Sequence, residues 1–191
     1  MWVPGQLRVR VLALAVFGMA AQCLMTAQSA LDPRSHSVDP IATAKGKPVV
    51  LIFVRTDCPI SNRYAPEIQR LSAKYARQAD FWLIYPSKSD TFDLITAELK
   101  EFSYKIPALR DPEYALVKRA HAEITPEAAV FNAHGDLVYH GRIDDWYEDF
   151  GRARAKPTTH DLDDAVGATL SGHAVAKSKT KAVGCYLADL Q

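Results

Sequence analysis

The feature that most constrains the fold is the continuous apolar run PVVLIFV at Pro48–Val54. An uninterrupted β-branched run of this length is typical of a strand covered on both faces. Apolar residues then recur at helical spacing, at Tyr64, Ile68, Leu71 and Tyr75. A second buried-strand run, FWLIYP, follows at Phe81–Pro86. A strand, a helix and a strand in this order predict a βαβ unit whose two strands are parallel.

The rest of the domain predicts further elements of both kinds. A second helix is expected from Thr91 to about Tyr104, after a Ser/Asp capping pattern. A short strand or loop and a third helix beginning at Pro112 come next. Two strand-like runs joined by NAHGD predict an antiparallel hairpin, and a last helix is expected from about His160 to Leu170. This order implies an α/β fold with a mixed central sheet flanked by helices.

The N-terminus has the pattern of an export signal. Arg8 and Arg10 precede the apolar run VLALAVFGMAAQCLM, and the small, polar TAQSA follows it. A basic start, a short apolar core and a small-residue step predict a secretory signal peptide over 1–29. The run is shorter than the roughly 20 residues that span a membrane. An uncleaved anchor and a lipoprotein signal at Cys23 remain alternatives, the latter disfavoured by Gln22.

The predicted organisation is a signal peptide, an arm, one domain and a tail. After the signal, residues 30–46 are polar, contain proline and show no period, so they predict a linker or N-terminal arm. The α/β domain is expected over 47–172 and a C-terminal tail with a cysteine over 173–191. The expected location is periplasmic or extracellular, without stable membrane insertion after cleavage. A net charge of +1 without a long basic run gives no footprint for nucleic acid.

The segment TDCPISNRYAPE contains the candidate nucleophile, Cys58. The cysteine follows a buried strand, and Pro59 occupies the expected first helical position. Cys58 would then lie at the positive end of the helix dipole, where backbone N–H groups stabilise a thiolate. Ser61, one turn further on, can point its hydroxyl back at the sulfur. The alternative is a buried structural cysteine without chemistry.

Nearby charges act on such a thiolate in both directions. Arg55 and Arg63 would add positive potential, whereas Asp57 and Glu127 would oppose ionisation. The sequence does not decide between these effects.

The segments VVLIFVRTDCPISNRYAPEIQRL and ITPEAAVFNAHGDLVYHG together resemble the thioredoxin superfamily, in its secreted redoxin and thiol-peroxidase-like (AhpC/TSA) branch. The resemblance covers roughly 47–170 and implies a thioredoxin-like fold. It also implies that Cys58 is the redox cysteine, that Pro66 kinks the helix, and that the Thr125–Pro126 bond is cis. Thr125 and Pro126, with Pro59, would then shape the substrate groove beside the sulfur.

The chain also departs from the family pattern at several positions. Ser61 replaces the second motif cysteine, so a local dithiol–disulfide cycle is impossible. Asp57 replaces the usual tryptophan, and Ile52 replaces the buried acid of thioredoxins. Arg55 stands where peroxiredoxins have the Thr or Ser that helps bind peroxide. Peroxidase activity therefore does not follow from the resemblance alone.

A distant cysteine offers a partner for Cys58. Once the signal is removed, only Cys58 and Cys185 remain, in a compartment where disulfides persist. Gly184 gives the tail backbone freedom, and the lysine-rich stretch before it would serve as a tether. Cys185 would resolve an oxidised or mixed-disulfide Cys58. A permanent structural disulfide and a free thiol remain the alternatives.

The sequence thus predicts an exported thiol oxidoreductase without a cofactor, performing thiol–disulfide exchange or peroxide reduction. Its partners would be protein thiols or disulfides, or a peroxide, and an external thiol electron donor. One alternative is a non-catalytic binding module held by a structural Cys58–Cys185 disulfide. Another is a copper carrier, although the six histidines show no metal-ligand spacing.

Two smaller features near the end of the domain carry expectations of their own. The paired acids Asp144 and Asp145 predict a solvated turn rather than an acid/base pair. The aromatic loop 146–150 predicts packing against the core, with a substrate groove as the alternative.

Overall fold

The computed structural model describes Met1 and residues 30–187. The expected signal peptide therefore lies outside the described residues, apart from Met1. The helices are α1 Pro40–Thr43, α2 Pro59–Tyr75, α3 Phe92–Glu101, α4 Ala115–Ala120 and α5 Asp161–Leu170. The strands are β1 Ala30–Leu31, β2 Ser37–Val38, β3 Val49–Phe53, β4 Asp80–Tyr85, β5 Ala108–Arg110, β6 Ile124–Thr125, β7 Glu127–Phe131, β8 Leu137–Gly141, β9 Tyr147–Asp149, β10 Arg152–Ala153 and β11 Cys185–Tyr186.

The central sheet is mixed, as the sequence predicts. Its seven strands run in the order β2-β1-β5-β4-β3-β7-β8. The strands β3, β4 and β5 are mutually parallel, whereas β7 and β8 form the expected antiparallel hairpin beside β3. The candidate redox cysteine follows the carboxyl end of β3, the strand that lies between the parallel β4 and the antiparallel β7.

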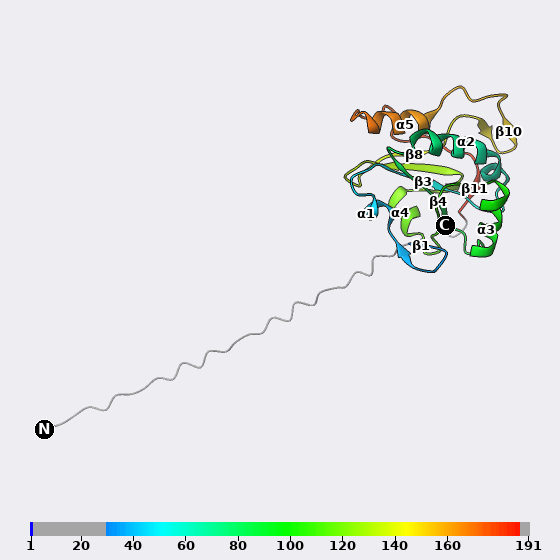
Figure 1. The fold of residues 1–191 in the computed structure, drawn as a ribbon. Helices are drawn as coiled ribbons and strands as arrows, with labels where there is room; N and C mark the ends of the chain where they lie inside the picture. The colour runs from blue at the N-terminus through cyan, green and yellow to red at the C-terminus, as the bar shows by residue number, and fades with distance from the viewer. Residues whose placement is uncertain (2–29, 188–191) are drawn as a thin grey trace.

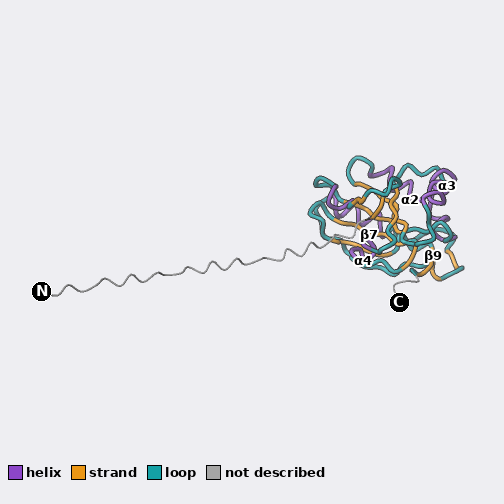
Figure 2. The backbone as a smooth tube through the Cα atoms, turned by 90° about the horizontal axis from the view of Figure 1, so that it is seen from below, coloured by secondary structure: helices purple, strands orange, loops and turns teal. Residues whose placement is uncertain are grey.

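Both faces of the sheet are covered by helices, which confirms the interpretation of the PVVLIFV run. In β3, Val50 and Ile52 belong to a core cluster that includes α2, α3 and α5 residues. The alternate β3 residues belong to a second cluster with α1 and α4 residues. Figure 1 shows α2 and α5 on one side of the sheet and α1 and α4 on the other. In Figure 2 the strands occupy the middle of the domain.

The predicted face of α2 is confirmed, because Tyr64, Ile68, Leu71 and Tyr75 are all buried. The third helix begins later than predicted, at Ala115 rather than at Pro112. The Asp111 carboxylate accepts hydrogen bonds from the backbone N–H groups of residues 115, 116 and 117. The segment between Asp111 and the helix is therefore a turn, and the carboxylate satisfies the helix's free N–H groups.

The N-terminal arm is more ordered than its sequence suggests. The strands β1 and β2 form a small antiparallel hairpin, and β1 also pairs with β5 at the sheet edge. The helix α1 follows, with Asp39 accepting hydrogen bonds from the N–H groups of Ile41 and Ala42. These elements are only two to four residues long, too short to show as a periodic pattern in the sequence.

The described C-terminal tail lies along the domain as a strap over residues 173–187. Its middle pairs with β8, since His140 N–H donates to the Ser178 carbonyl (2.9 Å) and Thr180 N–H donates to the His140 carbonyl (3.1 Å). Gly141 permits this approach, because a Cβ there would lie 2.3 Å from the Thr180 carbonyl oxygen. The strap then ends in β11, which pairs with β6.

Candidate active site

Cys58 occupies the junction between β3 and α2. It is the N-cap residue of α2, with Pro59 at the first helical position, and its side chain makes no capping bond. The residue is completely buried. The sulfur therefore lies at the positive end of a 17-residue helix without being used to cap that helix.

The Thr125–Pro126 segment lies against the sulfur. The peptide bond before Pro126 is cis, which confirms what the resemblance implies. The Cys58 thiol donates a hydrogen bond to the Thr125 carbonyl oxygen at 3.1 Å. A carbonyl oxygen can accept this bond only while the sulfur carries its proton. The bond therefore stabilises the protonated form of Cys58 and orients the sulfur toward β6.

Ser61 lies beneath Cys58 on the first turn of α2. It is 1% exposed, and its hydroxyl has no hydrogen-bond partner among the described residues while Cys58 is a thiol. The hydroxyl and the Ser61 backbone N–H nevertheless both lie close enough to the sulfur to lower the pKa of Cys58. An otherwise unpartnered donor beside the sulfur is suited to a thiolate rather than to a thiol.

Cys185 lies next to Cys58, although 127 positions separate them in the sequence. In the antiparallel pairing of β11 with β6, Cys185 stands opposite Thr125, whose carbonyl accepts the Cys58 thiol. Both cysteines are free thiols, and a hydrogen bond from Cys185 lowers the pKa of Cys58. Strand pairing, rather than a flexible tether, thus brings the two thiols together.

Gly184 has a different role from the predicted one. Gly184 allows its segment to pack closely against β6, since a Cβ there would lie 2.1 Å from the Thr125 carbonyl oxygen and 2.7 Å from its carbonyl carbon. Only a residue without a side chain lets the strand approach β6 this closely.

The two thiols differ in acidity. Burial acts to raise the pKa of Cys58, but hydrogen bonds from the side chains of Cys185, Ser61 and Thr125 outweigh it and leave the pKa below its ordinary value. Burial raises the pKa of Cys185 to about 12, and its hydrogen bond to Cys58 and the charge of that group add to the shift. The proton shared by the pair therefore resides on Cys185, and the thiolate forms on Cys58.

The charged side chains near Cys58 interact with groups other than the sulfur, which the sequence does not predict. Arg55 pairs with Asp57 at 2.8 Å, so the two charges largely offset each other beside the site. Arg63 stacks over the Trp146 ring, 5.2 Å from its centroid. Glu127 accepts the backbone N–H groups of Glu123 and Ile124 and holds the turn that leads into β6.

Asp90 is a residue that the sequence reasoning missed. It is 1% exposed, and its carboxylate accepts hydrogen bonds from the Thr56 hydroxyl (2.6 Å) and backbone N–H (3.3 Å). Asp90 therefore holds the loop that precedes Cys58. The SDT segment suggested only a helix cap, a function that Thr91 performs for α3, and no local pattern reports a contact across 34 positions.

The prediction of a solvated turn at Asp144 and Asp145 is wrong, because both are buried. Asp144 accepts hydrogen bonds from the Tyr64 hydroxyl (2.6 Å) and the Trp146 N–H (2.8 Å). Asp145 accepts bonds from the Thr158 and Thr159 backbone. The two carboxylates organise the loop after β8, and the sequence lacks a signal for partners that lie up to 80 positions away.

The aromatic loop packs against the core at one end, as expected. Tyr147 is buried and contacts the Tyr64 ring, with 6.0 Å between centroids. Phe150 is 67% exposed and lines a cavity of about 320 Å³ that Gly184 and Tyr186 also line. One end of the loop is core, and the other borders the C-terminal strand.

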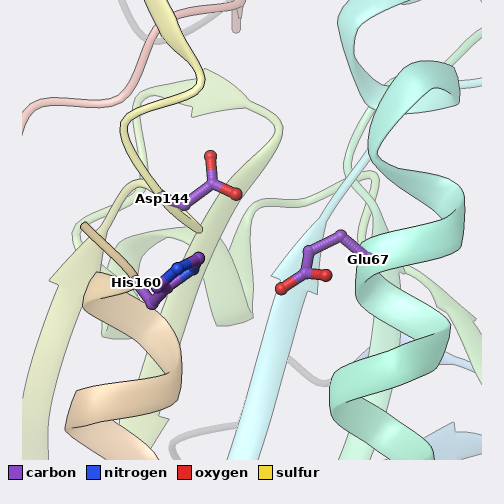
Figure 3. A group of neighbouring side chains, drawn as sticks. All are labelled: Glu67, Asp144 and His160. Carbon is purple, nitrogen blue, oxygen red and sulfur yellow. The ribbon is translucent and has the colours of Figure 1, made fainter. Parts of the chain in front are cut away.

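One group of side chains in the described part of the chain has the composition of a metal site. The donor atoms of Glu67, Asp144 and His160 lie within 4.8 Å of one another, at the junction of α2, α5 and the loop after β8 (Figure 3). Both Glu67 oxygens already accept Arg70 at 2.7 Å, which places a competing cation beside the group. The two cysteines have no third ligand at that spacing among the described residues, so the geometry adds nothing to the copper hypothesis.

Comparison with known proteins places the chain in a family. The family model described as Redoxin matches residues 24–154, more than half of the sequence. The chain therefore belongs to the Redoxin family and is a redoxin-type protein of the thioredoxin superfamily. Proteins of this class are thiol oxidoreductases in general. The family and fold that the sequence predicts are thus confirmed.

Solved structures agree on the fold. A hypothetical protein, SMc02350 from Sinorhizobium meliloti 1021, superposes with a TM-score of 0.72 at 23% identity, covering 83% of this chain and 88% of the other. An uncharacterized conserved protein from Geobacillus kaustophilus gives the same score and identity over 83% and 87%. A secreted Mycobacterium tuberculosis disulfide oxidoreductase, homologous to E. coli DsbE, gives 0.51 at 18% identity over 75% and 94%.

No curated protein matches the sequence. Within the part of the chain that the structure describes, no helix has the length and apolar character needed to cross a membrane.

Proposed function

We propose that this chain is an exported thiol–disulfide oxidoreductase in which Cys58 is the nucleophile and Cys185 the resolving thiol. The observation that carries the proposal is the pairing of β11 with β6, which holds Cys185 opposite Thr125 and beside the Cys58 sulfur. The pKa of one thiol is lowered and that of the other raised, so the roles are distinct.

The reaction follows from this arrangement. The Cys58 thiolate attacks one sulfur of a substrate disulfide, forming a mixed disulfide and expelling the other substrate sulfur as a thiolate. Cys185 loses its proton to that leaving thiolate and then attacks the Cys58 sulfur. The second substrate thiol leaves, and a Cys58–Cys185 disulfide remains. An external dithiol, becoming a disulfide itself, restores the two thiols.

Ser61 and the Thr125–Pro126 segment both support this chemistry. The Ser61 hydroxyl is placed to stabilise the thiolate each time it forms, on attack and on release. Thr125 and Pro126 form the wall of the substrate groove, with Pro59 at the helix end.

Export is part of the proposal and rests on the sequence pattern of 1–29. The test is the fractionation of cells that produce the chain with and without those residues. Recovery of the shortened form outside the cytoplasm, in equal amount, would contradict it.

The central test is a redox titration of the purified exported protein, with thiol alkylation and mass spectrometry. We expect a Cys58–Cys185 disulfide with a potential above about −300 mV, the range of cycling rather than structural disulfides. Cys185→Ser should accumulate the mixed disulfide on Cys58, whereas Cys58→Ser should form none. A bond that stays oxidised far below this potential would make it a structural staple and leave the binding-module alternative. Rapid oxidation by hydrogen peroxide at low concentration would instead indicate a peroxidase.

A further inference from the structure

The strand β11 occupies an edge that has no other strand partner in the described structure. It forms a separate two-stranded sheet with β6, apart from the seven-stranded one. Cys185 stands opposite Thr125 and Tyr186 opposite Ile124, and the Leu187 N–H donates to the Glu123 carbonyl at 3.0 Å. Backbone pairing of this kind is how extended peptides add to exposed strand edges.

The edge is prepared independently of β11. Glu127 accepts the backbone N–H groups of Glu123 and Ile124, at 2.8 and 3.2 Å, through a side chain that is itself buried. The backbone groups that receive β11 are therefore held by the domain rather than by the strand.

The edge restricts the residue type at two positions of β11, Gly184 and Leu187. A Cβ at Gly184 would collide with the Thr125 backbone, so the residue before the cysteine must be glycine. The Leu187 side chain is 4% exposed and packs into the core cluster under α4. The Tyr186 side chain, by contrast, is 63% exposed, so the edge does not restrict the residue type at that position. The edge thus selects a Gly-Cys-x-Leu pattern in extended conformation.

We propose that residues 184–187 are a built-in competitor, which closes the β6 edge to partner polypeptides that present an extended Gly-Cys-x-Leu-like segment. The inference rests on the proposed function. It adds that β11 controls access to Cys58 and that partners with one sequence pattern are preferred. Cys58 is fully buried while β11 is in place, so a protein substrate reaches the sulfur only by displacing the strand. The partner's disulfide first occupies the position of Cys185 and exchanges with Cys58 as already described. The strand β11 then returns to β6 and brings Cys185 back to attack the Cys58 sulfur of the mixed disulfide.

A tethered competitor has an effective concentration of about a millimolar, which weakens binding of a free peptide accordingly. The partner therefore succeeds only where its own segment is held close to the edge or fits better. Phe150, which is 67% exposed beside the cavity that β11 also lines, offers a surface for such additional contact.

The test measures binding without redox chemistry. The probe is a fluorescent peptide, KAVGSYL, which repeats residues 181–187 with serine in place of the cysteine. Its affinity by fluorescence anisotropy is compared for the wild-type chain and for Gly184→Ala, whose own strand cannot seat. We expect Gly184→Ala to bind the peptide at least about tenfold more tightly, because the intramolecular competitor is removed.

Two controls keep the test decisive. Leu187→Asp displaces the strand by a different change, and it should gain the same affinity, which guards against a local fault in one variant. The peptide KAVASYL, with alanine before the serine, should bind no form of the protein. Equal affinity of wild type and both variants for KAVGSYL, or equal affinity for the two peptides, would overturn the proposal. Because no thiol is used, a failure here leaves the redox titration as a separate test of the proposed function.

Discussion

At the scale of single residues, the acidity of Cys58 depends on donors that lie within one turn or one strand of the sulfur. Burial opposes ionisation, and hydrogen bonds from the side chains of Cys185, Ser61 and Thr125 outweigh it. The formal charges nearby contribute little because Arg55 is paired with Asp57. The site is therefore controlled by neutral dipoles, whose effect is insensitive to salt, rather than by ion pairs.

The hydrogen bond from Cys185 is tested by two substitutions of that residue. Cys185→Ala removes the donor, so the pKa of Cys58 should rise and less thiolate should be present at neutral pH. Cys185→Ser keeps a hydroxyl at the same place and should leave the pKa lowered. The measurement is the ultraviolet absorbance of the thiolate against pH, with Cys58 as the only thiol of the exported protein. Identical titration curves for the two variants would show that Cys185 does not act through a hydrogen bond.

Ser61→Ala should separate stability from reactivity. The Ser61 hydroxyl is buried without a hydrogen-bond partner among the described residues while Cys58 is a thiol. Its removal should therefore leave the free energy of unfolding at mildly acidic pH within about 0.5 kcal/mol of the wild-type value. The thiolate loses a donor, so the pKa of Cys58 should rise and mixed-disulfide formation at neutral pH should slow. Urea denaturation and stopped-flow kinetics check the two halves. A large loss of stability with unchanged kinetics would give Ser61 a purely structural role.

At the scale of the elements, the sequence predicts well those helices and strands that have a periodic or turn pattern within their own segment. The apolar run of β3, the helical spacing in α2 and the turn of the β7–β8 hairpin are local signals, and each element is present. The two-residue strands β1, β2, β6 and β11 have no period and are fixed only by their partners. For the same reason the sequence supplies both cysteines of the candidate site but not the strand pairing that joins them.

The strap before β11 depends on Thr180. Its hydroxyl accepts the Arg142 backbone N–H at 3.0 Å and lies 2.7 Å from the Tyr139 hydroxyl. Thr180→Val keeps the shape but leaves a backbone N–H unpaired, at a cost of about 1–3 kcal/mol. We expect faster proteolysis of the tail and slower closure of the Cys58–Cys185 disulfide.

Thr169→Val is the matched control for this change. The Thr169 hydroxyl bonds only the Ala165 carbonyl, within the helix α5, so its loss should leave both rates near those of the wild type. If the two variants behave alike, the strap does not depend on the Thr180 hydroxyl.

At the scale of the whole molecule, the buried acids make stability depend on pH. Asp111 and Glu98 both have pKa values raised by burial, in each case to about 6. Each therefore binds a proton in the folded chain at a pH where the unfolded chain has released it. Folding stability contributed by such groups falls as pH rises from the unfolded to the folded pKa.

Glu98 offers the clearest test of this dependence. It is 7% exposed, and burial raises its pKa from the ordinary 4.5 to about 6. The charged form is thus disfavoured by about 2 kcal/mol, a loss that develops between about pH 4.5 and 6 and persists above it. Glu98→Gln removes that loss. The difference in unfolding free energy between Glu98→Gln and the wild type should therefore rise by about 1–2 kcal/mol as the pH increases across this window. Urea denaturation at pH 4.5 and at pH 7.5 measures the change, with the exposed Glu101→Gln on the same helix as control. A difference between Glu98→Gln and wild type that is the same at both pH values would mean that the carboxyl of Glu98 does not titrate in this range.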